Sequence, residues 1–196
     1  MITASRKIVI LQNSREAANP LCSVPFIVSE VEGVTVVPGR VWPSFEAAIG
    51  QGETQSRWGS VSRTVGRLPT GVLDVNTLQI AQTFAPYCAT YPGREVLLDL
   101  AQTSLDGLIV VDGSWSQLQD FIRLNRWIED IRVLRVQAAS TGRVSKQRLS
   151  AVGAVAVFLG VLDKRPEYME QLLGPYRAFL QQQGVADDPM FYQEEK

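Results

Sequence analysis

Short runs of apolar residues constrain the fold of this chain more than any other feature of its sequence. They occupy residues 6–11 (RKIVIL), 34–37 (VTVV) and 107–111 (GLIVV), and they are rich in β-branched side chains. Runs of this length and composition are typical of buried strands. Segments with helical patterns separate them, and this alternation predicts an α/β fold, a single domain with a largely parallel sheet flanked by helices.

Helix signals lie between and after these runs. Asn13 and Ser14 could cap a helix that ends before Pro20, and Ser44 could cap one over residues 45–49. Ser114 precedes a helix with an apolar face, and residues 150–162 are apolar enough to predict a buried helix. Pro166 begins another helix, which Gly174-Pro175 is expected to interrupt.

The remaining segments complete the expected organisation. We predict a loop over residues 51–71, helices over 76–84 and 95–102, strands over 87–91 and 131–136, and a polar loop over 137–148. Residues 1–183 are expected to form one domain, and residues 184–196 a polar C-terminal tail. The sequence leaves the oligomeric state open.

Composition excludes several classes of function. The chain has 196 residues and no histidine, which removes Ser-His-Asp and Cys-His nucleophile systems and histidine-based zinc sites. Two cysteines, Cys22 and Cys88, cannot form a disulfide framework or a four-thiolate zinc site, so we expect no metal. No run approaches the roughly 20 apolar residues of a membrane span, and the N-terminus lacks a secretory pattern. We therefore expect a cytoplasmic protein with no membrane partner.

Basic residues are unevenly distributed despite a net charge of −1. Arginine supplies 15 of the 19 cations, and arginine binds phosphate and carboxylate groups through a forked pair of hydrogen bonds. Residues 121–150 hold seven cations against two acids. This segment could attract a polyanion such as RNA, or its arginines could simply pair with nearby carboxylates; charge alone leaves both readings open.

Asp112-Gly113-Ser114-Trp115 is the sharpest candidate for chemistry. It follows the third apolar run, and ligands of open parallel sheets bind beyond the carboxyl ends of the strands. A carboxylate there could act as a general base. The alternative is a plain Asp-Gly turn with a capping serine and a core tryptophan. Tyr91-Pro92-Gly93 follows another expected strand and could approach a flat ligand closely, or be an ordinary turn.

The order of these segments resembles the DTW-domain family. Residues 10–16 (ILQNSRE) with Asn19 are similar to the family's "LQHPxE…N" segment, and Tyr91-Pro92-Gly93 to its "YP" loop. Residues 110–115 (VVDGSW) resemble the signature "LDGTW", and residues 149–156 (LSAVGAVA) resemble "LSTxEAxA". The chain departs from the family at Asn13, Ser114, Ala151 and Gly153, where the family has histidine, threonine, threonine and glutamate, and it lacks the N-terminal cysteine cluster that often binds zinc.

The resemblance implies both a fold and a reaction. The implied fold is SPOUT-like, with a deep trefoil knot near the C-terminus. The implied reaction transfers the 3-amino-3-carboxypropyl group of S-adenosylmethionine to N3 of a uridine in tRNA and releases methylthioadenosine. An aminocarboxypropyltransferase acting on rRNA or a small molecule, or a non-catalytic module that binds S-adenosylmethionine or RNA, remains an alternative. Losing the glutamate at position 153 could change the substrate or the activity.

The resemblance also assigns roles to individual residues. Asp112 would accept or organise the N3 proton. Residues that would line the cofactor are Tyr91, Pro92, Gly93, Gly113, Ser114, Trp115 and Ser150. Basic residues that would contact the substrate are Arg15, Arg123, Arg126, Arg143, Lys146 and Arg148.

Overall fold

The computed structural model describes residues 1–52, 58–61, 95–97, 106–130, 132–134, 137–139, 150–163, 165–185 and 189. Within this part of the chain, five strands form one sheet in the order β2-β1-β5-β3-β6, and every neighbouring pair is parallel. The strands are β1 (Ile2–Asn13), β2 (Val31–Gly39), β3 (Trp58–Val61), β5 (Gly107–Asp112) and β6 (Arg132–Leu134). The predicted α/β fold with a parallel sheet is confirmed.

The central strands are buried on both faces, which explains their apolar runs. Ile8 and Ile10 pack on one side of β1, and Val9 and Leu11 pack on the other. The side chains of β5 alternate in the same way. Because successive side chains of a strand point to opposite faces, a strand covered by helices on both faces must be apolar at every position.

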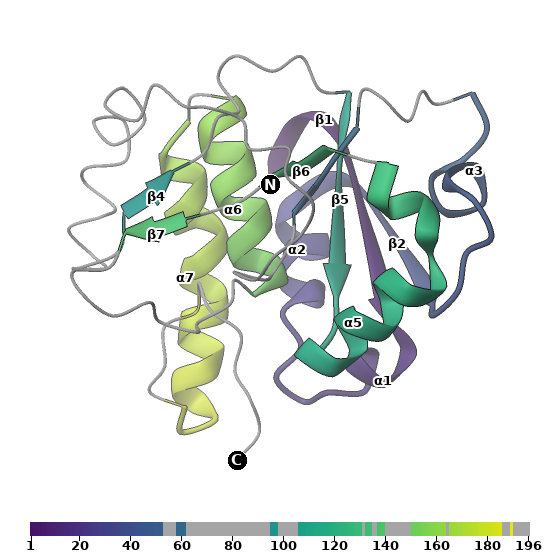
Figure 1. Ribbon diagram of the computed structural model, residues 1–196. Helices are drawn as coiled ribbons and strands as arrows, with labels where there is room; N and C mark the ends of the chain where they lie inside the picture. The colour runs from purple at the N-terminus through teal and green to yellow at the C-terminus, as the bar shows by residue number, and fades with distance from the viewer. Residues whose placement is uncertain are drawn as a thin grey trace.

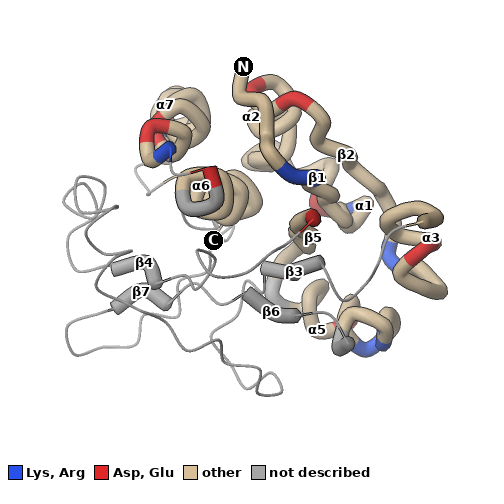
Figure 2. Tube along the Cα trace, turned by 90° about the horizontal axis from the view of Figure 1, so that it is seen from above, with Lys and Arg blue, Asp and Glu red and all other residues tan. Residues whose placement is uncertain are grey.

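Helices cover the two faces of the sheet (Figures 1 and 2). One face packs against α2 (Val24–Glu30), α6 (Ala151–Leu162) and α7 (Glu167–Gln182). The other packs against α3 (Phe45–Ile49), α5 (Trp115–Leu124) and the 3-10 helix η2 (Arg126–Asp130). Among the described residues, no helix is both long enough and apolar enough to span a bilayer.

Local capping signals are confirmed at several helix starts. The Asn13 side chain accepts a hydrogen bond from the Arg15 amide at the start of α1 (Ser14–Ala17). Ser44 caps α3, and Ser114 caps α5. The helix predicted over residues 150–162 is α6, and its described side chains, residues 151–160, are all buried. Side-chain oxygens at these positions satisfy amides that have no partner within the helix.

Several expectations are corrected. The segment 58–61 lies in the predicted loop 51–71 and forms β3. Instead of a helix over residues 95–102, β4 (Glu95–Leu97) pairs antiparallel with β7 (Gln137–Ala139), which lies in the loop predicted over 137–148. Pairing between segments so distant in sequence can override local propensity. The predicted elements over 76–84 and 87–91 lie outside the described residues.

The prediction for the C-terminal helix is also corrected. We expected Gly174-Pro175 to interrupt it, yet α7 continues from residue 167 to residue 182. Leu172, Leu173 and Tyr176 are buried on both sides of the proline, and α7 packs along α6. Pro175 itself is exposed, so water can solvate the carbonyl group that loses its partner. A glycine before proline has no Cβ to clash with the ring, which favours the helical conformation there.

Helix α2 was not predicted, because the sequence analysis assigned no element to residues 21–33. Pro25 lies in its first turn, where a proline costs little since the amide has no helical partner. Phe26 of α2 packs against Tyr176 and Phe179 of α7, with ring centroids 5.3 and 5.2 Å apart. The helix therefore draws its stability from tertiary packing.

Candidate active site

Asp112 and Gln12 meet at the carboxyl edge of the sheet. They are paired in register on the neighbouring strands β5 and β1. The Gln12 side-chain amide Nε2 donates a hydrogen bond to Asp112 Oδ2 at 3.1 Å. Both residues are buried, Asp112 with 4% and Gln12 with 7% of its surface exposed. A buried carboxylate needs such a donor, because burial without a hydrogen bond is costly.

Strand alternation shows which face these side chains occupy. Gln12 lies two residues after Ile10, and Asp112 lies two residues after Val110. Ile10 and Val110 both belong to the core under α2, α6 and α7. Because residues two apart share a face, Gln12 and Asp112 lie on the α6 side of the sheet.

The segment that follows β1 folds back onto this pair. Glu16 in α1 is buried, and its Oε1 accepts a hydrogen bond from Asn19 Nδ2 at 2.8 Å. Asn19 Oδ1 accepts from the Leu21 amide at 2.9 Å, and the Asn19 carbonyl accepts from the Cys22 amide at 3.0 Å. These bonds fix the backbone between α1 and α2, and they bring Cys22 towards Gln12.

Cys22 lies against the polar pair. Gln12 Nε2 donates a second hydrogen bond, to Cys22 Sγ, at 3.3 Å. Burial, helped by the negative charges of Asp112 and Glu16, raises the pKa of the Cys22 thiol to about 11. The thiol is therefore protonated and neutral at physiological pH, unlike a reactive cysteine, whose pKa is lowered.

The start of α6 joins the same region. Ser23 Oγ accepts a hydrogen bond from the Val152 amide at 3.3 Å, which links the loop before α2 to the first turn of α6. Ser150 Oγ accepts from the Gly153 amide at 2.9 Å and donates to the Pro189 carbonyl at 2.8 Å. Parts of the segments 10–16, 110–115 and 149–156 thus lie along one edge of the sheet. The Tyr91-Pro92-Gly93 segment lies outside the described residues.

The turn after Asp112 is tightly built. Ser114 Oγ and the Gln117 side chain form a reciprocal capping box, in which the Ser114 amide donates to Gln117 Oε1 at 2.9 Å. A Cβ at Gly113 would lie 2.9 Å from that Oε1, closer than such atoms approach, so glycine leaves room for the cap. Trp115 is the first residue of α5, and its side chain lies outside the described part.

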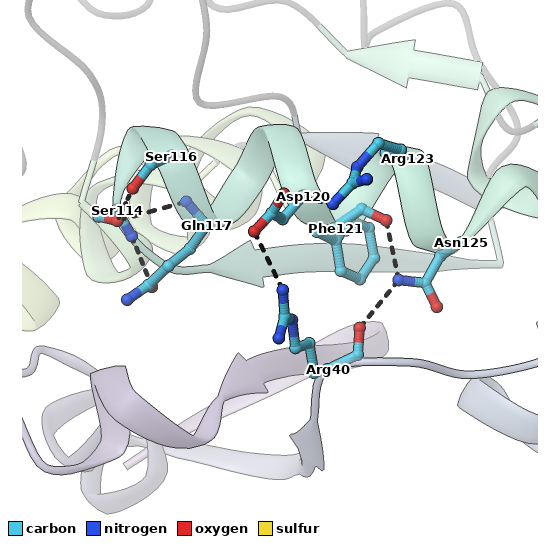
Figure 3. A network of polar contacts seen from close by, with 8 residues as sticks. All are labelled: Arg40, Ser114, Ser116, Gln117, Asp120, Phe121, Arg123 and Asn125. Carbon is cyan, nitrogen blue, oxygen red and sulfur yellow. Dashed lines mark hydrogen bonds and ion pairs between the residues drawn. The ribbon is translucent and has the colours of Figure 1, made fainter.

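A pair of exposed arginines lies beside α5 (Figure 3). Arg40, which follows β2, and Arg123 of α5 both donate to Asp120, over 3.1 and 3.0 Å. Arg15 in α1 and Arg126 in η2 are also exposed. Three further predicted contacts, Arg143, Lys146 and Arg148, lie outside the described residues. Within that described part, no group of acidic or cysteine side chains could hold a metal ion.

Sequence reasoning assigned no individual role to Gln12, Glu16, Cys22 or Arg40. The sequence contains only an indirect signal for Gln12: it directly follows an apolar run, as Asp112 does. Its contact with Asp112 could not be predicted, because that contact depends on which strands are neighbours and on their register. Arg40 stands outside the basic segment 121–150, and only the fold brings it to Asp120.

Comparison with known protein families finds one match, which covers most of the chain. Residues 1–184 match the DTW domain. No curated protein and no solved structure matches the chain. The match spans each of the segments that meet at the carboxyl edge of the sheet.

Proposed function

Because the chain belongs to the DTW-domain family, we propose that it transfers the 3-amino-3-carboxypropyl group of S-adenosylmethionine to N3 of a uridine in tRNA. The family implies a transferase of the aminocarboxypropyl type that modifies RNA. The observation that carries the proposal is the buried contact between Gln12 and Asp112 at the carboxyl edge of the sheet. Ligands of open parallel sheets bind at this edge.

The charges at this edge fit a cationic ligand. Asp112 and Glu16 are both buried, and their negative charges both act on the Cys22 thiol. A sulfonium and an amino group are cations that such carboxylates would hold. S-adenosylmethionine would supply an electrophilic carbon next to its sulfonium, without any metal. Arg15, exposed in the neighbouring α1, is our candidate for the carboxylate of the transferred arm.

Asp112 has the central role in this mechanism. Its carboxylate would accept the N3 proton of the uracil as the new N–C bond forms and the C–S bond of the arm breaks, which releases methylthioadenosine. A general base contributes roughly 10²–10⁴-fold in rate. Orienting the two reactants accounts for most of the remaining acceleration.

Ser114 and Ser150 would contribute to the site indirectly, by holding the backbone at the starts of α5 and α6. The Ser114 amide and hydroxyl are engaged in the cap of α5, and the Ser150 hydroxyl in the cap of α6 and in the contact with Pro189. We propose that both shape the turns that lead into these helices, with Gly113. Contacts of the cofactor with Tyr91, Pro92, Gly93 and Trp115 stay predictions.

The RNA would lie on the exposed arginines. Arg123 and Arg126 lie on and just after α5, the helix that follows Asp112. Arg143, Lys146 and Arg148 stay predicted contacts. The trefoil knot implied by the resemblance would involve the segment between β6 and α6, most of which lies outside the described residues, and it stays a prediction as well.

The test replaces Asp112 by asparagine. The purified protein is incubated with labelled S-adenosylmethionine and bulk RNA, and the nucleosides and methylthioadenosine are measured by mass spectrometry. We expect the wild type to add the arm to uridine, and Asp112→Asn to bind the cofactor more weakly and, at saturating cofactor, to lose about 10²–10⁴-fold in rate. Asp106→Asn, just before the opposite end of β5, is the matched control and should stay close to wild type.

The product distinguishes this proposal from its alternatives. Arm transfer to rRNA uridine or to a small molecule would replace tRNA as the substrate. Methyl transfer would move the protein to another reaction class, and cofactor binding without product would indicate a binding module. If Asp112→Asn transferred the arm at the wild-type rate, Asp112 would not be the general base.

A further inference from the structure

We propose that Gln12 is a positioning residue for Asp112: its side-chain amide fixes the orientation of the carboxylate and keeps it ionised. The inference rests on the proposed function, because it concerns how the base is held. It goes beyond it by assigning a separate role to a residue of the neighbouring strand.

The geometry leaves the Gln12 amide one favourable orientation. Its NH₂ group has two hydrogens, and two acceptors lie within reach, Asp112 Oδ2 at 3.1 Å and Cys22 Sγ at 3.3 Å. The opposite orientation would place the amide oxygen against a carboxylate oxygen, and two acceptors repel each other. Cys22 thus helps to determine which end of the amide faces Asp112.

The thiol suits this role because it stays neutral. Its pKa of about 11 means that Cys22 carries no negative charge at physiological pH. A thiolate would add a further negative charge beside Asp112 and Glu16. With the thiol protonated, Gln12 donates one hydrogen bond to a charged acceptor and one to a neutral acceptor, and the charged one is the stronger.

The groups around Asp112 influence whether its carboxyl group is protonated or ionised. Cys22, in the loop before α2, is influenced by the negative charges of both Asp112 and Glu16, and the described start of α6, residues 150–160, carries no titratable side chain. Burial of a carboxyl group favours its protonated form, whereas a hydrogen-bond donor favours the ionised form. Without the Gln12 donor, the base should ionise only at higher pH.

The test compares pH profiles of the transfer rate. Gln12→Met keeps the length of the side chain and removes both donors. We expect its acidic limb to move up by about one pH unit, so that the rate falls about ten-fold at acid pH and recovers at high pH. Gln12→Glu places a second carboxylate beside Asp112, and its limb should move further in the same direction.

Leu11→Ala is the matched control. Leu11 precedes Gln12 on the same strand and is fully buried on the opposite face, so its loss weakens the fold without touching Asp112. The acidic limb of its pH–rate profile should stay at the wild-type pH. Thermal unfolding of every variant gives the fraction of protein that is folded at the assay temperature. Wild-type limbs in both Gln12 variants, with Asp112→Asn still inactive, would overturn the positioning role and leave the proposed function intact. A fully active Asp112→Asn would instead overturn the proposed function.

Discussion

Asn125 accepts a 2.6 Å hydrogen bond from the backbone amide of Trp42, a residue 83 positions earlier in the chain. Its Nδ2 donates to the carbonyl oxygens of Arg40 and Phe121, over 3.0 and 2.8 Å, as Figure 3 shows in part. Only 1% of Asn125 is exposed. One side chain therefore joins the segment after β2 to the end of α5, and it places Arg40 beside Asp120.

Replacing Asn125 by alanine should lower the free energy of unfolding by about 2–4 kcal/mol. The variant leaves the Trp42 amide and the Arg40 carbonyl without their side-chain partner, and each unsatisfied buried group costs about 1–3 kcal/mol before relaxation and water entry. Chemical denaturation measures the change. Ser116→Ala, at an exposed position of α5, should stay within about 0.5 kcal/mol of wild type. An equally small effect of Asn125→Ala would contradict the bridging role.

Removing the shared acid of the arginine pair should strengthen RNA binding. In Asp120→Asn, Arg40 and Arg123 lose the carboxylate that both contact, and both become available to phosphate. We expect tighter binding of tRNA and a steeper fall of affinity with salt. Arg123→Ala should weaken binding and reduce the salt slope by about one. Filter binding over a series of salt concentrations measures both, and slopes equal to wild type would place the RNA elsewhere.

Alkaline pH should destabilise the fold through Cys22. Its folded pKa of about 11 lies above the ordinary thiol value of 9.0, so the folded state holds the proton more tightly than the unfolded chain. The stabilising contribution is complete below pH 9, and it is lost as the pH rises from 9 towards 11. The free energy of unfolding should therefore fall over this range by more in the wild type than in Cys22→Ala.

The same protonation should slow alkylation of Cys22. In a Cys88→Ser background, which leaves Cys22 as the one thiol of the chain, iodoacetamide should react slowly at pH 8, and the rate should still be rising above pH 10. A rate that levels off near pH 9 would contradict the raised pKa.

The tight turn at Gly113 predicts a specific coupling. In Gly113→Ala, the new Cβ would displace Gln117 Oε1 and break its bond to the Ser114 amide, at a cost of about 1 kcal/mol. Gln117→Ala should cost a similar amount, because it removes the same bond. The double variant should then cost little more than Gln117→Ala alone, and denaturation of the three proteins tests this. Additive costs would show that the clash is not with the Gln117 side-chain amide.

Features that depend on neighbouring residues could be predicted from the sequence. The buried strand before Asp112, the cap formed by Ser114 and the buried helix α6 each follow from a short stretch of chain. The position of Asp112 at a strand end was predicted for the same reason. Arg123 of α5 and Arg126 of η2 were visible in the sequence as part of the basic segment 121–150.

Features that depend on register or on distant packing could not be predicted. The partner of Gln12 is set by the parallel pairing of β1 with β5, 100 residues later. Residues 95–97 form a strand because residues 137–139 pair with them. Helix α7 continues through Pro175 because the side chains around the proline pack against α6. Local helix propensity does not include the energy of this packing.

Helix α6 ties the assembly of the candidate active site to the order of synthesis. Its described side chains, residues 151–160, are buried on every side, and they pack with strands that leave the ribosome long before them. Until this segment emerges, α2 is the only one of the three helices described on this face that has been made, and Ser23 has no Val152 amide to meet. A nascent chain that stops short of residue 162 would therefore expose a broad apolar surface and need a chaperone.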